Sequence, residues 1–266
     1  MDTLRVTTFG RPAEHDAAVK NGLYVDENLQ VEMLGTRSSK EQIRELLDDV
    51  WQVAHTNADN AFWWNDANDA DLLIVLAVLS PPNQNLVVRP EIMGYEDLRG
   101  KVIAVDASES GYATPLRVLL REAGLVEEGR DFQFVEVGST KERLIAMAEG
   151  RAVGGMVGVD GERPYDDNGL HVIDTINRLY KDYAGATIVR RRWAEENGDL
   201  LVRYLRAHLR GQSAVDAERG QATPSGFSWG GLREMLEMRS GLGMLRGPVD
   251  PTLHATDRYY KLAVGA

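Results

Sequence analysis

Short apolar runs alternate along this chain with stretches whose apolar positions recur at helical spacing. The apolar runs predict strands at Leu4–Phe9, Gln30–Leu34, Trp51–Thr56, Leu72–Leu79, Lys101–Val105, Phe132–Val137, Gly154–Val159, His171–Ile176 and Ala184–Val189. The helical spacing predicts helices at Ala13–Asn21, Ser39–Leu47, Thr114–Ala123, Thr140–Glu149 and Arg192–Leu209, and in much of the remaining C-terminal part. Such alternation is typical of α/β proteins with mostly parallel sheets.

Two segments far apart in the chain repeat the same order of features. Ser38–Ile43 and Ser139–Leu144 each follow a predicted strand and a glycine, and each begins with Ser-x-x-Glu. This spacing is a capping box, which satisfies free amide groups at the start of a helix. The repeated order of strand, glycine, capped helix and strand favours two similar α/β lobes.

The chain is expected to cross between these lobes twice. Asn85–Pro90 is extended and ends at a proline, which suits a crossover strand, and Asp182–Val189 is the expected return. Lobe one then comprises 1–87 plus 187–266, and lobe two comprises 88–186. We therefore predict two interleaved α/β lobes joined by two crossover strands.

Composition limits the classes of function. The 266 residues are 43% apolar and 27% charged, which is ordinary for a globular protein with a sizeable core. The net charge of -11 argues against nucleic acid as a partner. The lack of cysteine excludes disulfides and thiolate catalysis. The apolar run Leu72–Leu79 is much shorter than the ~20 residues that span a bilayer, so no membrane span is expected.

The first residues bear on location. Met1–Val6 leads directly into a predicted strand, without the basic segment and apolar stretch of a signal peptide. As written, the chain is expected in the cytoplasm. If a leader has been removed, the periplasm or the outside of the cell is expected instead.

Several short segments resemble one known family. Tyr95–Asp106 is similar to a "dLkGKkvav" stretch of periplasmic solute-binding proteins, in particular the nitrate/sulfonate/taurine-binding and NMT1/THI5-like group. Further similar segments are Gly22–Val25, Thr114–Leu125, Gly138–Gly150 and Arg190–Arg206. The resemblance implies a type II periplasmic-binding-protein-like fold with a ligand cleft between the lobes. It also implies an ABC permease and ATPase as partners, and we expect a monomer.

In such sheets, ligands bind at the carboxyl ends of strands, beside helix N-termini. We expect ligand contacts from the loops that follow predicted strands, at Phe9, Arg11, Arg37, Ser38, Ser39, His55, Thr56, Asn57, Asn60, Ser108, Ser110, Gly111, Tyr112, Gly158 and Asp160. An arginine such as Arg11 can hold a carboxylate or sulfonate bidentately, or can simply be solvated. The serine at 38 can cap its own helix and do nothing more.

Two functions remain open on this fold. The first is a small-molecule-binding protein that closes around a small organic ligand, anionic or aromatic. The alternative is a cofactor-independent lyase, decarboxylase or hydrolase with His55 as general acid or base, although His55 also suits a structural, hydrogen-bonded role. No cofactor is expected, and the histidine spacing offers no metal site.

Overall fold

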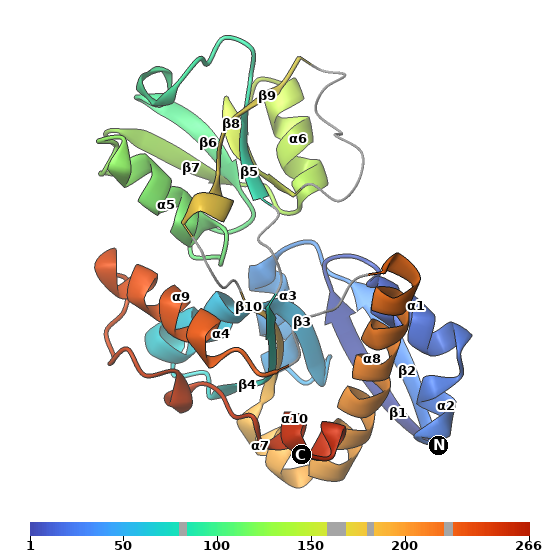
Figure 1. Cartoon of the computed structure of the whole chain (residues 1–266). Coiled ribbons are helices and arrows are strands. Elements are labelled where there is room, and N and C mark those ends of the chain that lie inside the picture. The colour runs from blue at the N-terminus through green and yellow to red at the C-terminus, as the bar shows by residue number, and fades with distance from the viewer. Residues whose placement is uncertain (80–83, 159–168, 180–183, 221–225) are drawn as a thin grey trace.

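The computed structural model describes residues 1–79, 84–158, 169–179, 184–220 and 226–266. Within these residues the chain forms two five-stranded sheets, each flanked by helices (Figure 1). Both termini lie in the lobe built on the first sheet (Figure 1). The expected α/β class and the two lobes are confirmed. None of the described helices is long and apolar enough to cross a membrane.

The first sheet draws strands from both ends of the chain. Its order is β2-β1-β3-β10-β4, with bounds β1 (Asp2–Thr8), β2 (Leu29–Gly35), β3 (Val53–Asn57), β4 (Leu72–Leu79) and β10 (Ala184–Arg190). β1 is parallel to β2 and β3, whereas β10 is antiparallel to both of its neighbours. The sheet is therefore mixed, which the strand pattern alone did not predict.

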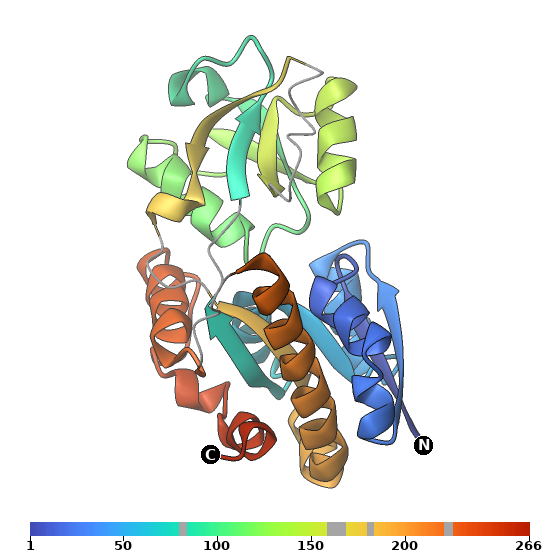
Figure 2. The same ribbon diagram turned by 45° about the vertical axis from the view of Figure 1, so that its right-hand side comes forward.

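Helices cover both faces of the first sheet (Figure 2). One face carries α1 (Ala13–Lys20), α2 (Leu23–Asp26), α8 (Gly198–Arg219) and α10 (Arg258–Val264), and the apolar cluster there contains Leu4, Val75 and Leu205. The opposite side carries α3 (Ser39–Leu47), α4 (Ala58–Asn68) and α9 (Trp229–Gly241). Gly211 lets α8 lie close to α1, because a Cβ there would be 2.3 Å from the carbonyl oxygen of Glu14.

The second sheet has the order β7-β6-β8-β5-β9. Its strands are β5 (Gln84–Val88), β6 (Lys101–Val105), β7 (Phe132–Glu136), β8 (Gly154–Gly158) and β9 (His171–Thr175). The long helices α5 (Ala113–Glu122) and α6 (Thr140–Ala148) contribute to different apolar clusters. The second lobe also contains two short 3₁₀ helices, η1 (Tyr95–Leu98) and η3 (Ile176–Arg178). The first lobe also contains the 3₁₀ helix η4 (Pro251–Leu253) and the short α-helix α7 (Arg191–Glu196).

The crossings differ in place from the expectation. β5 pairs with β8 and β9, so the expected crossover strand at Asn85–Pro90 lies in the second sheet. β10 lies wholly in the first sheet. The predicted boundaries at 87/88 and 186/187 therefore fall inside strands, and the chain changes sheet between β4 and β5 and between η3 and β10.

Two predicted helical features also differ in detail. The expected helix Arg192–Leu209 is two helices, because Asn197 separates α7 from α8, and α8 continues to Arg219. The capping box at Ser38 is confirmed by the Glu41 amide, which donates to Ser38 Oγ at 3.1 Å. At Ser139 the hydroxyl instead contacts the Glu142 carboxylate, and no side-chain cap of α6 forms.

Candidate ligand-binding site

The starts of α3, α4 and α5 meet where the two lobes face each other. α4 begins directly after β3, since Asn57 Oδ1 accepts the amide of Asp59 at 2.8 Å and caps the helix. The Gly111 amide, just before α5 in the second lobe, donates to Asn60 Oδ1 at 3.2 Å. Asn60 is held in turn through its Nδ2, which donates to Thr56 Oγ1 at 2.8 Å. Polar groups of both lobes therefore converge at helix N-termini, which favour acceptor atoms and negative charge.

Gly111 lies directly against Asn57. A Cβ at position 111 would be only 2.2 Å from Asn57 Cγ. The absence of a side chain at this position therefore permits the observed approach of the lobes.

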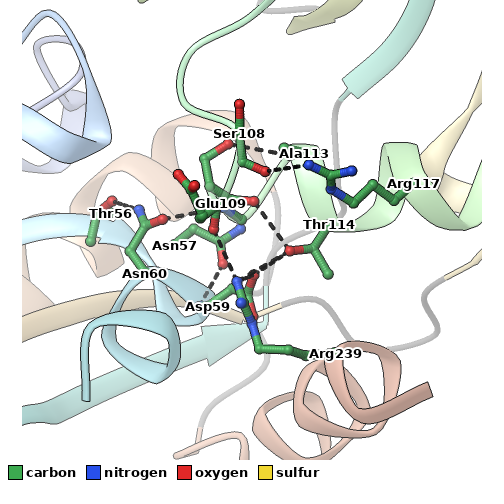
Figure 3. Close-up of polar contacts among 12 residues, drawn as sticks. Thr56, Asn57, Asp59, Asn60, Ser108, Glu109, Ala113, Thr114, Arg117 and Arg239 are labelled. Carbon is green, nitrogen blue, oxygen red and sulfur yellow. Dashed lines mark hydrogen bonds and ion pairs between the residues drawn. The ribbon is translucent and has the colours of Figure 1, made fainter. Parts of the chain in front are cut away.

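A buried ion pair lies below these residues (Figure 3). Arg239 of α9 donates from Nε to Asp59 Oδ1 at 2.8 Å and from Nη2 to Asp59 Oδ2 at 2.6 Å, and the two residues are 0% and 1% exposed. The second lobe adds Thr114, whose Oγ1 donates to Asp59 Oδ2 at 2.7 Å, and the Glu109 carbonyl, which accepts from Arg239 at 3.0 Å. The pair is thus bidentate and joined to both lobes, the geometry that makes a buried charge pair tolerable.

A second buried carboxylate, Asp106, follows β6. It is 6% exposed and accepts hydrogen bonds from Ser39 Oγ of the first lobe, at 2.8 Å, and from Ser110 Oγ. Arg143 of α6 lies near enough for its charge to matter: burial lowers the pKa of this guanidinium, and Asp106 offsets part of that effect. Asp106 therefore links the start of α3 in the first lobe to the segment before α5 in the second lobe.

An exposed ion pair marks the rim of this interface. Lys40 Nζ lies 3.2 Å from Glu136 Oε2 and 3.9 Å from Glu109 Oε2. Burial alone would raise the pKa of Glu136, but the Ser108 amide and Lys40 bring it below its ordinary value. This contact again joins the first lobe to the second.

His55 has a different environment from the one expected. Its Nε2 meets the Tyr204 hydroxyl, its Nδ1 lies 3.2 Å from Thr187 Oγ1, and its ring stacks on His208 at 4.6 Å. Burial, followed by the charges of His208 and His15, lowers the pKa of His55 well below its usual value. In the described residues its hydrogen bonds stay within the first lobe, as a structural histidine would make them.

Other expected contact residues are distributed as follows. Arg11 is exposed and pairs with Asp16 of α1, Phe9 is 41% exposed, and Arg37 is exposed. Tyr112 packs against the apolar cluster at the start of α5, and Gly158 ends β8. The prediction at Asp160 lies outside the described residues.

The residues brought together at the lobe interface are Ser39, Thr56, Asn57, Asn60, Ser108, Ser110 and Gly111. Sequence reasoning did not select Asp59, Asp106, Thr114 or Arg239. Asp106 directly follows β6, and Asp59 lies two positions after the end of β3, so their place in the sequence was a usable signal. Arg239 comes from a helix near the C-terminus, and no local pattern ties it to Asp59.

Two lobes, a chain that crosses between them twice and a polar interface between helix N-termini define the class of two-lobed ligand-binding proteins. Residues 24–208 match the family described as "ABC transporter, phosphonate, periplasmic substrate-binding protein". The chain belongs to this family, and the expected kinship with ABC-transporter substrate-binding proteins is confirmed. No curated protein sequence matches the chain.

Solved structures agree on the fold. A protein from Bordetella bronchiseptica RB50 superposes with a TM-score of 0.77 at 16% identity, covering 100% of this chain and 98% of that one. The alkanesulfonate-binding protein SsuA from Xanthomonas axonopodis pv. citri, bound to MOPS, gives 0.70 at 16% identity, covering 95% and 89%. The nitrate-binding protein NrtA from Synechocystis PCC 6803 gives 0.66 at 17% identity, covering 94% and 68%.

Proposed function

We propose that this protein binds a small organic molecule between its lobes, at the N-termini of α3, α4 and α5, and delivers it to an ABC permease and ATPase as a monomer. The observation that carries the proposal is the set of hydrogen bonds across the interface: Ser39 to Asp106, Gly111 to Asn60 and Thr114 to Asp59. Each joins a group at a helix start in one lobe to a group in the other.

Such contacts suit a protein that closes around its ligand. Bonds between lobes form only when the lobes are together, so a ligand that touches both lobes shifts the population toward the closed state. A few placed polar groups then give orientation, while apolar walls give affinity. In this chain the polar groups are Ser39, Asn57, Asn60, Ser110 and Asp106.

The enzyme alternative receives no support from the site. A general acid or base must reach the proton that it transfers. His55 holds Tyr204 and Thr187 instead. Both oxygens of the buried carboxylate Asp59 already accept hydrogen bonds from Arg239.

The proposal is tested by a binding screen followed by product analysis. The purified chain is screened by thermal shift against small phosphonates, sulfonates, nitrate, amines and N-heterocycles, and each hit is measured by calorimetry. We expect one class to bind and to be recovered unchanged, and Asn60→Ala to weaken it about tenfold, as the loss of a buried hydrogen bond implies.

Arg11→Ala is the matched control, because Arg11 is exposed and pairs within the first lobe. It should bind like the wild type. A screen without any hit, or a hit that is converted to product, would contradict the proposed function.

A further inference from the structure

Two serine hydroxyls at the lobe interface are already committed to the chain's own carboxylate. Ser39, the first residue of α3, and Ser110, just ahead of α5, both donate to Asp106. Serine hydroxyls at the start of a helix can donate to an oxyanion beside the backbone amides there. Here Asp106, which is 6% exposed, takes them from both lobes.

The nearby positive charge is committed as well. Arg143, 3% exposed, donates from Nε to the Met156 carbonyl at 2.7 Å, from Nη1 to the Gly138 carbonyl at 2.8 Å and from Nη2 to Thr140 Oγ1 at 2.9 Å. Burial lowers the pKa of Arg143, and the negative charge of Asp106 acts in the opposite direction. Each of the three Arg143 nitrogens therefore already donates to an acceptor of the second lobe.

The other cations described at the interface are occupied in the same way. Arg239 is bound to Asp59, and Lys40 lies between Glu136 and Glu109. Arg37 is exposed at the edge. An oxyanion beside Asp106 would meet a like charge and would have to compete with this carboxylate for the two serine hydroxyls.

We propose that Asp106 determines the specificity of the site by excluding oxyanions, so that the ligand is a neutral or cationic molecule that donates a hydrogen bond to this carboxylate. The inference rests on the proposed function and narrows its ligand. A carboxylate has about four acceptor positions, and the two serines use two of them. An amine or a heterocyclic N–H fits the remainder, in contrast to the phosphonate, sulfonate and nitrate named for the family and its structural relatives.

The test is whether removing Asp106 admits an oxyanion. Methylphosphonate, methanesulfonate and nitrate are titrated into wild type, Asp106→Asn and Asp106→Ala, with thermal shift and calorimetry as readouts. We expect no measurable stabilisation of the wild type. The alanine variant should melt earlier, because Ser39 and Ser110 lose their shared acceptor. At least one oxyanion should restore its stability and bind at least tenfold more tightly than to wild type.

Two controls separate the effect of net charge from the effect of a carboxylate at position 106. Asp199→Asn removes one exposed carboxylate that pairs with Arg203 on α8, so it changes net charge equally but should gain no oxyanion binding. Adding Ser39→Ala to Asp106→Ala should abolish the gained binding. If Asp106→Ala does not fold, oxyanion binding is measured with Asp106→Asn, whose side chain has nearly the same shape as that of aspartate.

The outcomes are distinct. Oxyanion binding by the wild type, or no gain in either Asp106 variant, overturns this inference while leaving the proposed function standing. Failure of the wild type to bind any compound in the wider screen overturns the proposed function itself.

Discussion

At the scale of single residues, Gly111 sets how closely the lobes can approach. Its amide binds Asn60, and its Cα lies against Asn57 with no room for a methyl group. Asn57 cannot easily move aside, because its Oδ1 caps α4. A side chain at 111 would therefore oppose closure without disturbing either lobe alone.

We predict that Gly111→Ala weakens ligand binding at least tenfold while leaving the unfolding free energy within about 1 kcal/mol of wild type. Calorimetry with the ligand from the screen and chemical denaturation measure the two effects. Gly94→Ala is the matched control, since Gly94 has extended backbone and open space around its Cα. Unchanged affinity in Gly111→Ala would show that the lobes do not close on this contact.

Residue-scale features that depend on neighbours in sequence were predictable. Ser38 caps α3 because Ser-x-x-Glu fixes the geometry within one turn, and Asn57 caps α4 for a similar local reason. His55 was expected in the pocket, yet it packs on Tyr204 and His208. The surroundings of a strand residue depend on which helix covers that face, and α8 begins far along the chain.

At the scale of elements, α1, β3 and α8 bring three histidines together. Burial lowers the pKa of His208 to about 4 and that of His55 well below its usual value, and it also lowers the pKa of His15. The folded state thus keeps these rings neutral, while the unfolded chain protonates them near pH 6.5. Because the unfolded state binds more protons below that pH, stability is complete above it and falls as the pH drops toward the folded pKa.

We therefore expect the free energy of unfolding to fall by about 1.4 kcal/mol per pH unit below 6.5 for each ring that stays neutral in the fold. Urea denaturation from pH 8 to pH 5 measures this slope. His208→Gln should reduce this slope by about one such contribution. Near pH 8, the histidines should add no pH dependence to the stability of either protein. An identical slope in the variant would contradict the neutral state of His208.

The elements that sequence could not place are those joined over long distances. The run Ala184–Val189 predicted a strand, but not that it enters the first sheet antiparallel between β3 and β4. The pairing of Asp59 with Arg239 likewise depends on the packing of α9 on α4. Apolar periodicity reports which face of an element is buried, and it carries no information about the partner.

At the scale of the whole molecule, Thr114 connects the lobes through the Asp59–Arg239 pair. The pair itself bridges α4 and α9, so it survives when the lobes separate. Two hydrogen bonds to this pair break when the lobes separate: the bond from the Thr114 hydroxyl to Asp59 Oδ2 and the bond from Arg239 to the Glu109 carbonyl. Hydrogen bonds to a charged group are worth about 1.5–3 kcal/mol, so this contact biases the lobes toward closure.

We predict that Thr114→Val, which keeps the shape and removes the hydroxyl, shifts the unliganded protein toward open forms. Small-angle X-ray scattering should show a larger radius of gyration than wild type. Thr252→Val is the control, because its hydroxyl donates to Asp250, the residue that caps η4 in the first lobe. Equal radii of gyration for wild type and Thr114→Val would show that Thr114 does not stabilise the closed form.

From the place of β10 in the first sheet we infer an order of folding. In the part of the chain that the structure describes, β5 to β9 pair with one another, so the second sheet can form as soon as residue 175 has been synthesised. The first sheet stays split between β3 and β4 until Ala184–Arg190 arrives, and closing so long a loop makes that pairing slow. A chain interrupted before Ala184 therefore carries a complete second sheet beside an unfinished first one, with the apolar β4 still unpaired on the side that β10 covers.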